Sequence, residues 1–436
     1  MQKQTPAGSV WQRLQPHLPF LAWIGSLRDR RVLRADLLAG LTGAIVVLPQ
    51  GVAFATLAGM PPQYGLYSAM VPCIVAALFG ASRLMVTGPA NAISLTVLSL
   101  IAPLAVAGSD DYVRLVLTLT FMVACWQLLI GWAGLGRLVD RVPHSVIVGF
   151  TAGAAVLIVN SQVRNLFGFD WPRGLSVWQT LQRFVDDAAG IDWATTLVSA
   201  VTVVACVLAK PWNGRVPYML VGVLAGGLFA AAMPLFWNGF SVASVERLPG
   251  ALPPLSTPDL SFDTLRLLLM PSLVMTLLAL AEAISIARAI AVKTGTPLDG
   301  NREVIGQGLA NLAGSFFSSY PASGSFNRSG VNVAAGARTP LSAVSAALFL
   351  VLLLAFVAPL SKWLPLAAVA GILLMVAIGL IDLREIRHIA QHDRRDAVVM
   401  AVTFILVLAI PLEWAVLAGI GVHGILGMLI DRQQKV

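Results

Sequence analysis

The chain is poor in charged residues and almost free of cysteine. Charged residues make up 11% of its 436 residues, whereas 57% are hydrophobic. A soluble fold needs a charged surface, so this composition excludes one and indicates a helical membrane protein. The three cysteines, Cys73, Cys125 and Cys206, lie singly in apolar runs and form no CxxC pair. That pattern excludes a disulfide framework and a cysteine zinc site, and leaves them as small core residues.

The common signatures of enzymes are missing as well. No GxSxG, P-loop or HExxH motif occurs, so the sequence predicts no enzyme and no cofactor. Residues 419–424 match GxGxxG inside an apolar segment that follows no strand, which favours close helix packing. His388 and His392 have metal-ligand spacing, but nearby arginines would repel a cation. We therefore expect a solvated basic loop and no metal. The net charge of +8 is dispersed along the chain, so nucleic acid is not an expected partner.

Apolar sequence is abundant, in about fourteen stretches that could each cross or partly cross a bilayer. An even number of spans places both chain ends on one side. Basic residues concentrate in alternate loops on the N-terminal side, among them Arg137, Arg141 and Arg215, and acidic residues in the others. The positive-inside rule makes that side cytoplasmic in a multi-pass protein of the cell membrane. The stretches cover residues 36–58, 65–82, 89–107, 112–135, 143–163, 193–209, 216–236, 265–290, 303–317, 324–337, 340–360, 364–381, 397–411 and 413–430.

The third and tenth stretches are abnormal in the same way. Residues 83–91, RLMVTGPAN, are a short β-like run that leads through Gly-Pro into a helix, and residues 318–327 open the tenth stretch similarly. There, Ser323-Gly324-Ser325 predicts the N-cap and first turn of a helix. The two breaks are seven segments apart. Because seven is odd, the second break enters the membrane from the opposite face to the first, so we expect an inverted repeat whose two half-helices point their N-termini at each other. Free N–H groups at such helix starts favour an anion.

Three polar side chains accompany these breaks. Arg328 falls one turn into the tenth segment, where a guanidinium is costly enough to indicate function rather than snorkelling to an interface. Gln50 offers an amide at the middle of the first segment, beside a proline. Glu282 is predicted to be the sole carboxylate deep in an apolar segment. Burial favours the protonated form of a lone carboxyl, so we expect Glu282 to carry a coupling proton. The alternative is a structural carboxyl bonded to a neighbouring helix.

At these residues the sequence resembles the sulfate permease (SulP) family of anion transporters. The similarity is dense over residues 36–94, which contain LPQG, PPQYGLYSA, FGASR and a GPxxA-type segment, and it recurs in AEAISIARAIA and GSFNRSGVN. It extends over about residues 30–430. Members of the family usually continue into a cytosolic domain similar to anti-sigma factor antagonists. The sequence stops at Val436, soon after the last predicted segment, so the resemblance covers the membrane domain without that regulatory domain.

The resemblance implies fourteen segments in a 7+7 inverted repeat, divided into a core domain that carries the anion and a gate domain. Segments 1–4 and 8–11 would form the core domain, with segments 3 and 10 as half-helices. The gate domain would supply dimer or scaffold contacts, which allows a homodimer. The expected divisions are an N-terminal cytoplasmic or interfacial segment (1–35), the first half of the core (36–135), the first half of the gate (136–240), the second half of the core (241–360), the second half of the gate (361–430) and a cytoplasmic tail (431–436).

The same resemblance implies an anion site. Position by position, it falls on Gln50, Phe54, Ala90, Ser325, Phe326, Asn327 and Arg328, with Glu282 at the family's acidic position. Ala90 stands where many animal relatives have an aromatic residue, which would make the pocket roomier.

The function expected from these features is secondary active transport of a small anion such as sulfate, bicarbonate, chloride or a dicarboxylate. We expect coupling to protons, with sodium as the alternative ion. Two other functions stay open: a nucleobase–cation symporter of the same architecture, which a cationic Arg328 disfavours, and an anion channel. An intramembrane enzyme is a remote alternative, because no pair of nucleophile and base is visible.

Overall fold

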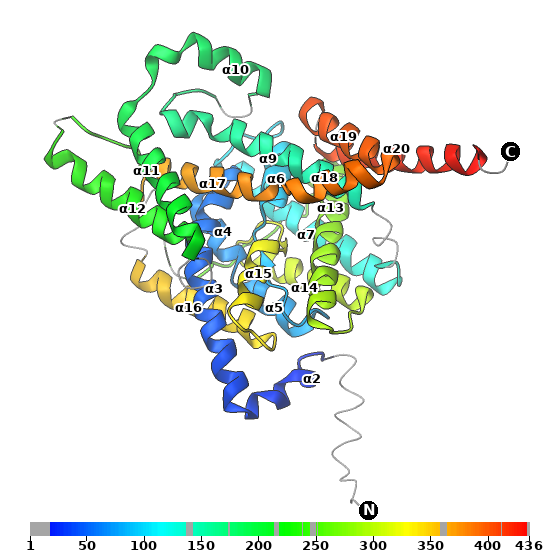
Figure 1. The fold of residues 1–436 in the computed structure, drawn as a ribbon. Helices are drawn as coiled ribbons and strands as arrows, with labels where there is room; N and C mark the ends of the chain where they lie inside the picture. Colours follow the sequence, from blue (N-terminus) through cyan, green and yellow to red (C-terminus); the bar gives the residue numbers. More distant parts are fainter. Residues whose placement is uncertain are drawn as a thin grey trace, which may run out of the picture.

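The computed structural model describes residues 18–136, 143–172, 175–212, 218–237, 239–244, 250, 252–357, 364–410 and 412–433. These residues are mostly helical (Figure 1), which confirms the predicted all-α membrane fold. Seven helical stretches of the described residues are long and apolar enough to cross a membrane, counting α4 with α5 and α17 with α18 as one stretch each, and three further apolar helices are shorter. Each predicted segment contains a helix, but the count of fourteen stays a prediction. Arg137, Arg141 and Arg215, the first seventeen residues and the last three lie outside the described residues.

The elements of the first half run to the end of the predicted seventh segment. They are α2 (Leu21–Ile24), η1 (Gly25–Arg28), α3 (Arg30–Leu57), α4 (Pro62–Ser68), α5 (Val71–Phe79), β1 (Thr87–Gly88), α6 (Asn91–Ile101), α7 (Asp110–Trp132), α9 (His144–Phe167), α10 (Val177–Asp186), η2 (Ala188–Gly190), α11 (Trp193–Ala209), η3 (Lys210–Trp212), α12 (Tyr218–Ala232) and η4 (Met233–Leu235).

The second half begins with the longest helix. It comprises α13 (Phe262–Thr294), α14 (Gly300–Phe316), β2 (Ser323–Gly324), α15 (Phe326–Ala334), α16 (Leu341–Val357), α17 (Leu366–Leu380), α18 (Leu383–His392), α19 (Arg394–Ala409) and α20 (Leu412–Gln433).

Two features differ from the sequence prediction. The second segment is broken into α4 and α5, because Pro72 in the first turn of α5 has no N–H to continue the preceding helix. The loop predicted around His388 and His392 is the helix α18, which is short and amphipathic. The two imidazole rings stack there with centroids 4.4 Å apart. Among the described residues, no cluster of His, Cys, Asp and Glu could hold a metal ion.

The helices pack as two groups. In group A (α3–α7 and α13–α16), α3 packs on α16 and α7 packs on both α13 and α14. In group B (α9, α11, α12, α17, α19 and α20), α9 packs on α17 and α19, α11 on α12, and α19 on α20. Figure 1 shows α9, α11 and α17–α20 above α5, α14, α15 and α16. The groups meet mainly where α3 contacts α12 and α17. Equivalent pairs, such as α3 on α16 and α13 on α7, are those that an inverted repeat requires.

Small residues bring helices together within each group. A Cβ placed on Gly65 would collide with the Gly51 carbonyl oxygen, so α3 and α4 approach at backbone distance in group A. In group B, a Cβ on Gly149 would meet the Met400 carbonyl, and one on Gly419 would lie 2.5 Å from Thr403 Oγ1. The packing role predicted for the GxGxxG match is therefore confirmed at Gly419.

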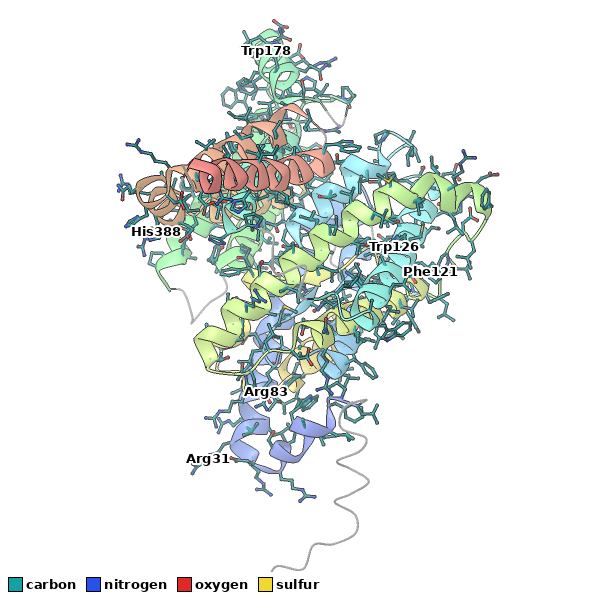
Figure 2. The ribbon with its side chains drawn as sticks, turned by 90° about the vertical axis from the view of Figure 1, so that its right-hand side faces the viewer. Arg31, Arg83, Phe121, Trp126, Trp178 and His388 are labelled. Atoms are coloured by element: carbon teal, nitrogen blue, oxygen red, sulfur yellow. The ribbon has the colours of Figure 1, made fainter. Side chains whose placement is uncertain are left out.

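The first described helices and α10 lie at opposite ends of the molecule. Figure 2 shows Arg31 and Arg83 at its lower end and Trp178, on α10, at the other. Arg31 belongs to the side predicted to be cytoplasmic, whereas α10 connects the predicted fifth and sixth segments on the other side.

Candidate functional site

Two very short strands bring the interrupted segments together. β1 pairs antiparallel with β2, with Thr87 opposite Gly324 and Gly88 opposite Ser323. Backbone that leaves the helix inside a bilayer must find hydrogen-bond partners within the protein, and here each break supplies the partners of the other. Because each strand leads directly into a helix, α6 and α15 both start beside this pairing.

The start of α15 lies later than the sequence indicated. Ser323 and Gly324 form the strand, and the N-cap is Ser325, whose backbone N–H donates to the Val86 carbonyl at 3.0 Å. The pairing with β1 therefore takes the residues predicted as a first helical turn. Neither Ser325 nor Ala90, the N-cap of α6, makes a side-chain capping bond. Both helix starts consequently present N–H groups and the positive ends of their dipoles without a side-chain cap.

Polar residues on α15 and α14 hold the pairing of β1 with β2 in place, and we call this pairing the crossing. Val86 N donates to Ser329 Oγ at 2.9 Å, and Asn332 Nδ2 donates to the Leu84 carbonyl at 3.0 Å. Gln307 Nε2 donates to Thr87 Oγ1 at 2.9 Å. Sequence reasoning missed these residues, although Ser329 and Asn332 follow Ser325 at helical spacing and so share its face of α15.

Arg328 lies between the two helix starts. Its side chain is 3% exposed, and Nη2 donates at 2.9 Å to the carbonyl of Pro89, which directly precedes the N-cap of α6. Its Nε is buried without a hydrogen-bond partner. A Cβ on Gly88 would lie 2.7 Å from Nη1, so glycine is what lets the guanidinium approach β1 so closely. The full positive charge adds to the partial charges of both helix starts.

The other candidate residues separate by exposure. Phe54 and Ala90 are buried in one hydrophobic cluster, and Ser325 is buried beside β1. Phe326 and Asn327 are exposed, Phe326 by 67%. The structure thus brings Ala90, Ser325 and Arg328 to the crossing, whereas the Phe326 and Asn327 side chains lie at an accessible surface.

Gln50 points toward group B. Its side chain is 2% exposed, and Nε2 donates to Met219 Sδ, on α12, at 3.1 Å. Gln50 Oε1 is buried without a partner. Nothing in the sequence around Met219 distinguishes it from an ordinary core methionine, so sequence reasoning did not find this contact.

Glu282 lies on α13, which packs against β2. The Ser323 hydroxyl donates to the Ala279 carbonyl at 2.8 Å, one turn before Glu282. Glu282 Oε2 is buried without a partner, although the side chain as a whole is half-buried. Among the described residues, no cation lies within 4.0 Å of its carboxyl, and Arg328 acts on it only at longer range.

Glu282 is not the only buried carboxylate, although Asp36 and Glu303 begin their predicted segments and do not lie deep in them. Asp36 and Glu303 are more completely buried. Glu303 Oε2 accepts from the backbone N–H groups of Ala81 and Ser82 at 2.8 and 2.7 Å, and Asp36 Oδ1 accepts from those of Arg338 and Thr339 at 2.7 and 3.1 Å. Loops folding over the segment ends bury both groups, which sequence periodicity does not reveal. Both are satisfied by backbone donors, in contrast to Glu282 Oε2.

Comparisons with known proteins agree with this architecture. "Sulfate transporter 4.1, chloroplastic" of Arabidopsis thaliana is 33% identical over 92% of this chain and 59% of its own length. "Probable sulfate transporter MT1781" of Mycobacterium tuberculosis is 31% identical over 90% of this chain and 70% of its own. The chain spans about 60% of the first two curated relatives it matches.

Solved structures give the same fold. The transmembrane domain of the cyanobacterium bicarbonate transporter BicA is similar with a TM-score of 0.80 and 27% identity, over 88% of this chain and 98% of that one. SLC26A9 is similar with a TM-score of 0.87 at 20% identity, over 98% of this chain and 70% of that one. The model of the family described as "Sulfate permease family" matches residues 33–403. The match covers most of this chain, and the structure has two opposed half-helices. The chain therefore belongs to the sulfate permease family.

Proposed function

We propose that the protein carries a small anion across the cell membrane by alternating access, in symport with protons. The observation that carries the proposal is the crossing of β1 and β2, where α6 and α15 start without side-chain caps and Arg328 lies buried between them. Opposed helix starts and a guanidinium are complementary to negative charge. Sulfate, bicarbonate, chloride and a small dicarboxylate are the candidate substrates, and the names of the relatives favour the first two.

The candidate binding residues are Gln50, Phe54, Ala90, Ser325, Phe326, Asn327 and Arg328. Ser325 and Arg328 supply polar groups at the crossing. Phe54 and Ala90 supply an apolar wall. Phe326 and Asn327 are exposed next to this crossing, where they would meet an anion that enters the site. A cationic Arg328 suits an anion better than a neutral nucleobase.

Groups A and B correspond to the core and gate domains of the proposal. Their extensive internal packing and sparser mutual contacts support a division at about residues 36–135 and 241–360 for the core, and 136–240 and 361–430 for the gate. The anion would stay on the core while the core moves against the gate, with both chain ends in the cytoplasm. A homodimer through the gate is compatible with this arrangement.

Uptake into proteoliposomes tests the proposal. We expect saturable uptake of at least one labelled anion from a panel of sulfate, bicarbonate, chloride and a dicarboxylate, and counterflow from preloaded vesicles. An inward proton gradient should accumulate the anion, whereas a sodium gradient alone should not. Unitary currents without saturation or counterflow would instead identify a channel.

A further inference from the structure

One side-chain hydrogen bond between described residues links the candidate anion site to the helices of group B. Among hydrogen bonds between described residues, only that from Gln50 Nε2 to Met219 Sδ joins a side chain of group A to one of group B. It lies where α12 meets α3. The contact therefore combines a proposed substrate ligand with the boundary across which the two groups would have to move.

While this contact is made, the Gln50 amide has no other hydrogen-bond partner among the described residues. Gln50 is 2% exposed and Met219 5%, and Gln50 Oε1 is buried with no hydrogen bond. A thioether sulfur is a weak acceptor, so the amide is held out of water with incomplete compensation. The Gln50 N–H would therefore gain free energy by donating to a stronger acceptor than the Met219 sulfur.

Each partner is fixed to its own group by close packing at a neighbouring glycine. Gly51, next to Gln50, lies against Gly65 of α4. Gly222, one turn after Met219, lies against Cys206 of α11, and a Cβ on Gly226 would collide with Thr202 of the same helix. Met219 consequently moves with α11 and α12, and Gln50 with α3 and α4. Any displacement between the groups must break or remake the bond between them.

We propose that Met219 is a gating residue that covers the Gln50 amide in the empty carrier and competes with the anion for the Gln50 N–H. This inference rests on the proposed anion site. An anionic oxygen or a halide accepts a stronger, charge-assisted hydrogen bond than a thioether does. Binding would therefore displace Met219, uncover Gln50 and remove the polar contact between α3 and α12.

Two substitutions of Met219 should act in opposite directions. Met219→Leu keeps the apolar bulk but accepts no hydrogen bond, so the apparent affinity for the transported anion should rise by about two- to tenfold. Met219→Gln offers an amide oxygen, a better acceptor than sulfur, and should lower the affinity by a similar factor. Met275→Leu, a buried methionine of the same hydrophobic cluster, is the matched control and should leave the affinity unchanged.

The measurements are sulfate binding in detergent and concentration-dependent sulfate uptake in proteoliposomes, repeated with another anion of the panel if sulfate is not transported. In a Gln50→Leu background, Met219→Leu and Met219→Gln should no longer differ. Equal affinity of both Met219 variants and the wild type, in a protein that transports, would overturn the gating role while leaving the proposed function intact. Loss of affinity in both variants would show a purely structural methionine. Absence of uptake of every anion by the wild type would instead overturn the proposed function.

Discussion

The Arg328 guanidinium lies where the starts of α6 and α15 meet, and it already makes one hydrogen bond. Nη2 binds the Pro89 carbonyl, while Nε is buried and unpartnered. A guanidinium tied to the loop before α6 orients that loop and also supplies charge. Its two roles, ligand and positioning residue, can be separated by substitution.

Arg328→Ala should weaken anion binding by about 10- to 100-fold, the value of a charge-assisted hydrogen bond. Arg328→Lys restores the charge but not the planar fork, so it should recover only part of the affinity. Binding of the transported anion by calorimetry, with thermal melting as a control for folding, measures both. An alanine variant that melts like the wild type and keeps its affinity would leave binding to the backbone N–H groups alone.

Glu282 presents the opposite situation, a buried carboxyl oxygen without a donor. Because burial disfavours a charged carboxylate and Arg328 favours one, proton and anion occupancy should be linked: an anion that screens Arg328 makes protonation easier. Glu282→Gln mimics the protonated form. We expect anion exchange to survive in this variant, while accumulation driven by a pH gradient is lost.

Asp36→Asn is the control, since Asp36 is held by the backbone N–H groups of Arg338 and Thr339, between α15 and α16. It should change stability rather than coupling. Accumulation by Glu282→Gln under a proton gradient alone would assign Glu282 a structural role and move the search to another coupling ion.

At the scale of elements, the sequence predicted the features that depend on local chemistry. Gly-Pro after a β-like run indicated the start of α6, and the serines before Arg328 indicated that of α15, with an error of two residues. That error arose because Ser323 and Gly324 pair with β1, and strand pairing over such a distance has no local signal. The amphipathic helices α10 and α18 were missed for a different reason: both are short and lie in segments interpreted as loops.

Side-chain contacts were less predictable than elements. The burial of Asp36 and Glu303 depends on loops from distant regions of the chain, and the bond between Gln50 and Met219 joins residues 169 positions apart. An apolar run such as that around Met219 is compatible with many packing partners. Only the assembled helices determine which methionine meets which amide.

The close approach of α3 and α4 gives a prediction about stability. A Cβ on Gly65 would collide with the Gly51 carbonyl, which is backbone and cannot rotate away. Gly65→Ala should therefore destabilise the protein by about 1–3 kcal/mol and lower its melting temperature in detergent. Gly421→Ala is the control, because nothing lies within 4 Å of a Cβ at that helical position and alanine favours a helix. Equal melting temperatures for both variants would contradict this packing.

The whole molecule is divided by how its helices pack. Group A and group B each contain glycines in backbone contact, whereas the boundary between them has apolar contacts and the bond from Gln50 to Met219. Interlocked backbones resist sliding, and apolar side chains at a boundary repack more easily. We therefore expect relative motion to concentrate between α3 and the pair α12 and α17.

A disulfide across this boundary should stop transport without abolishing binding. In a cysteine-free background, one cysteine on α3 would face another on α17, placed with Cβ atoms about 3.5–4.5 Å apart. The matched control joins two cysteines within group B, one on α11 facing another on α12, placed at the same Cβ separation. Because alternating access needs the groups to move but binding does not, the first disulfide should block uptake and retain anion binding, and reduction should restore uptake. The control disulfide should leave uptake intact. Undiminished uptake with the boundary disulfide fully formed would mean that the anion passes without relative motion of the groups, as in a channel.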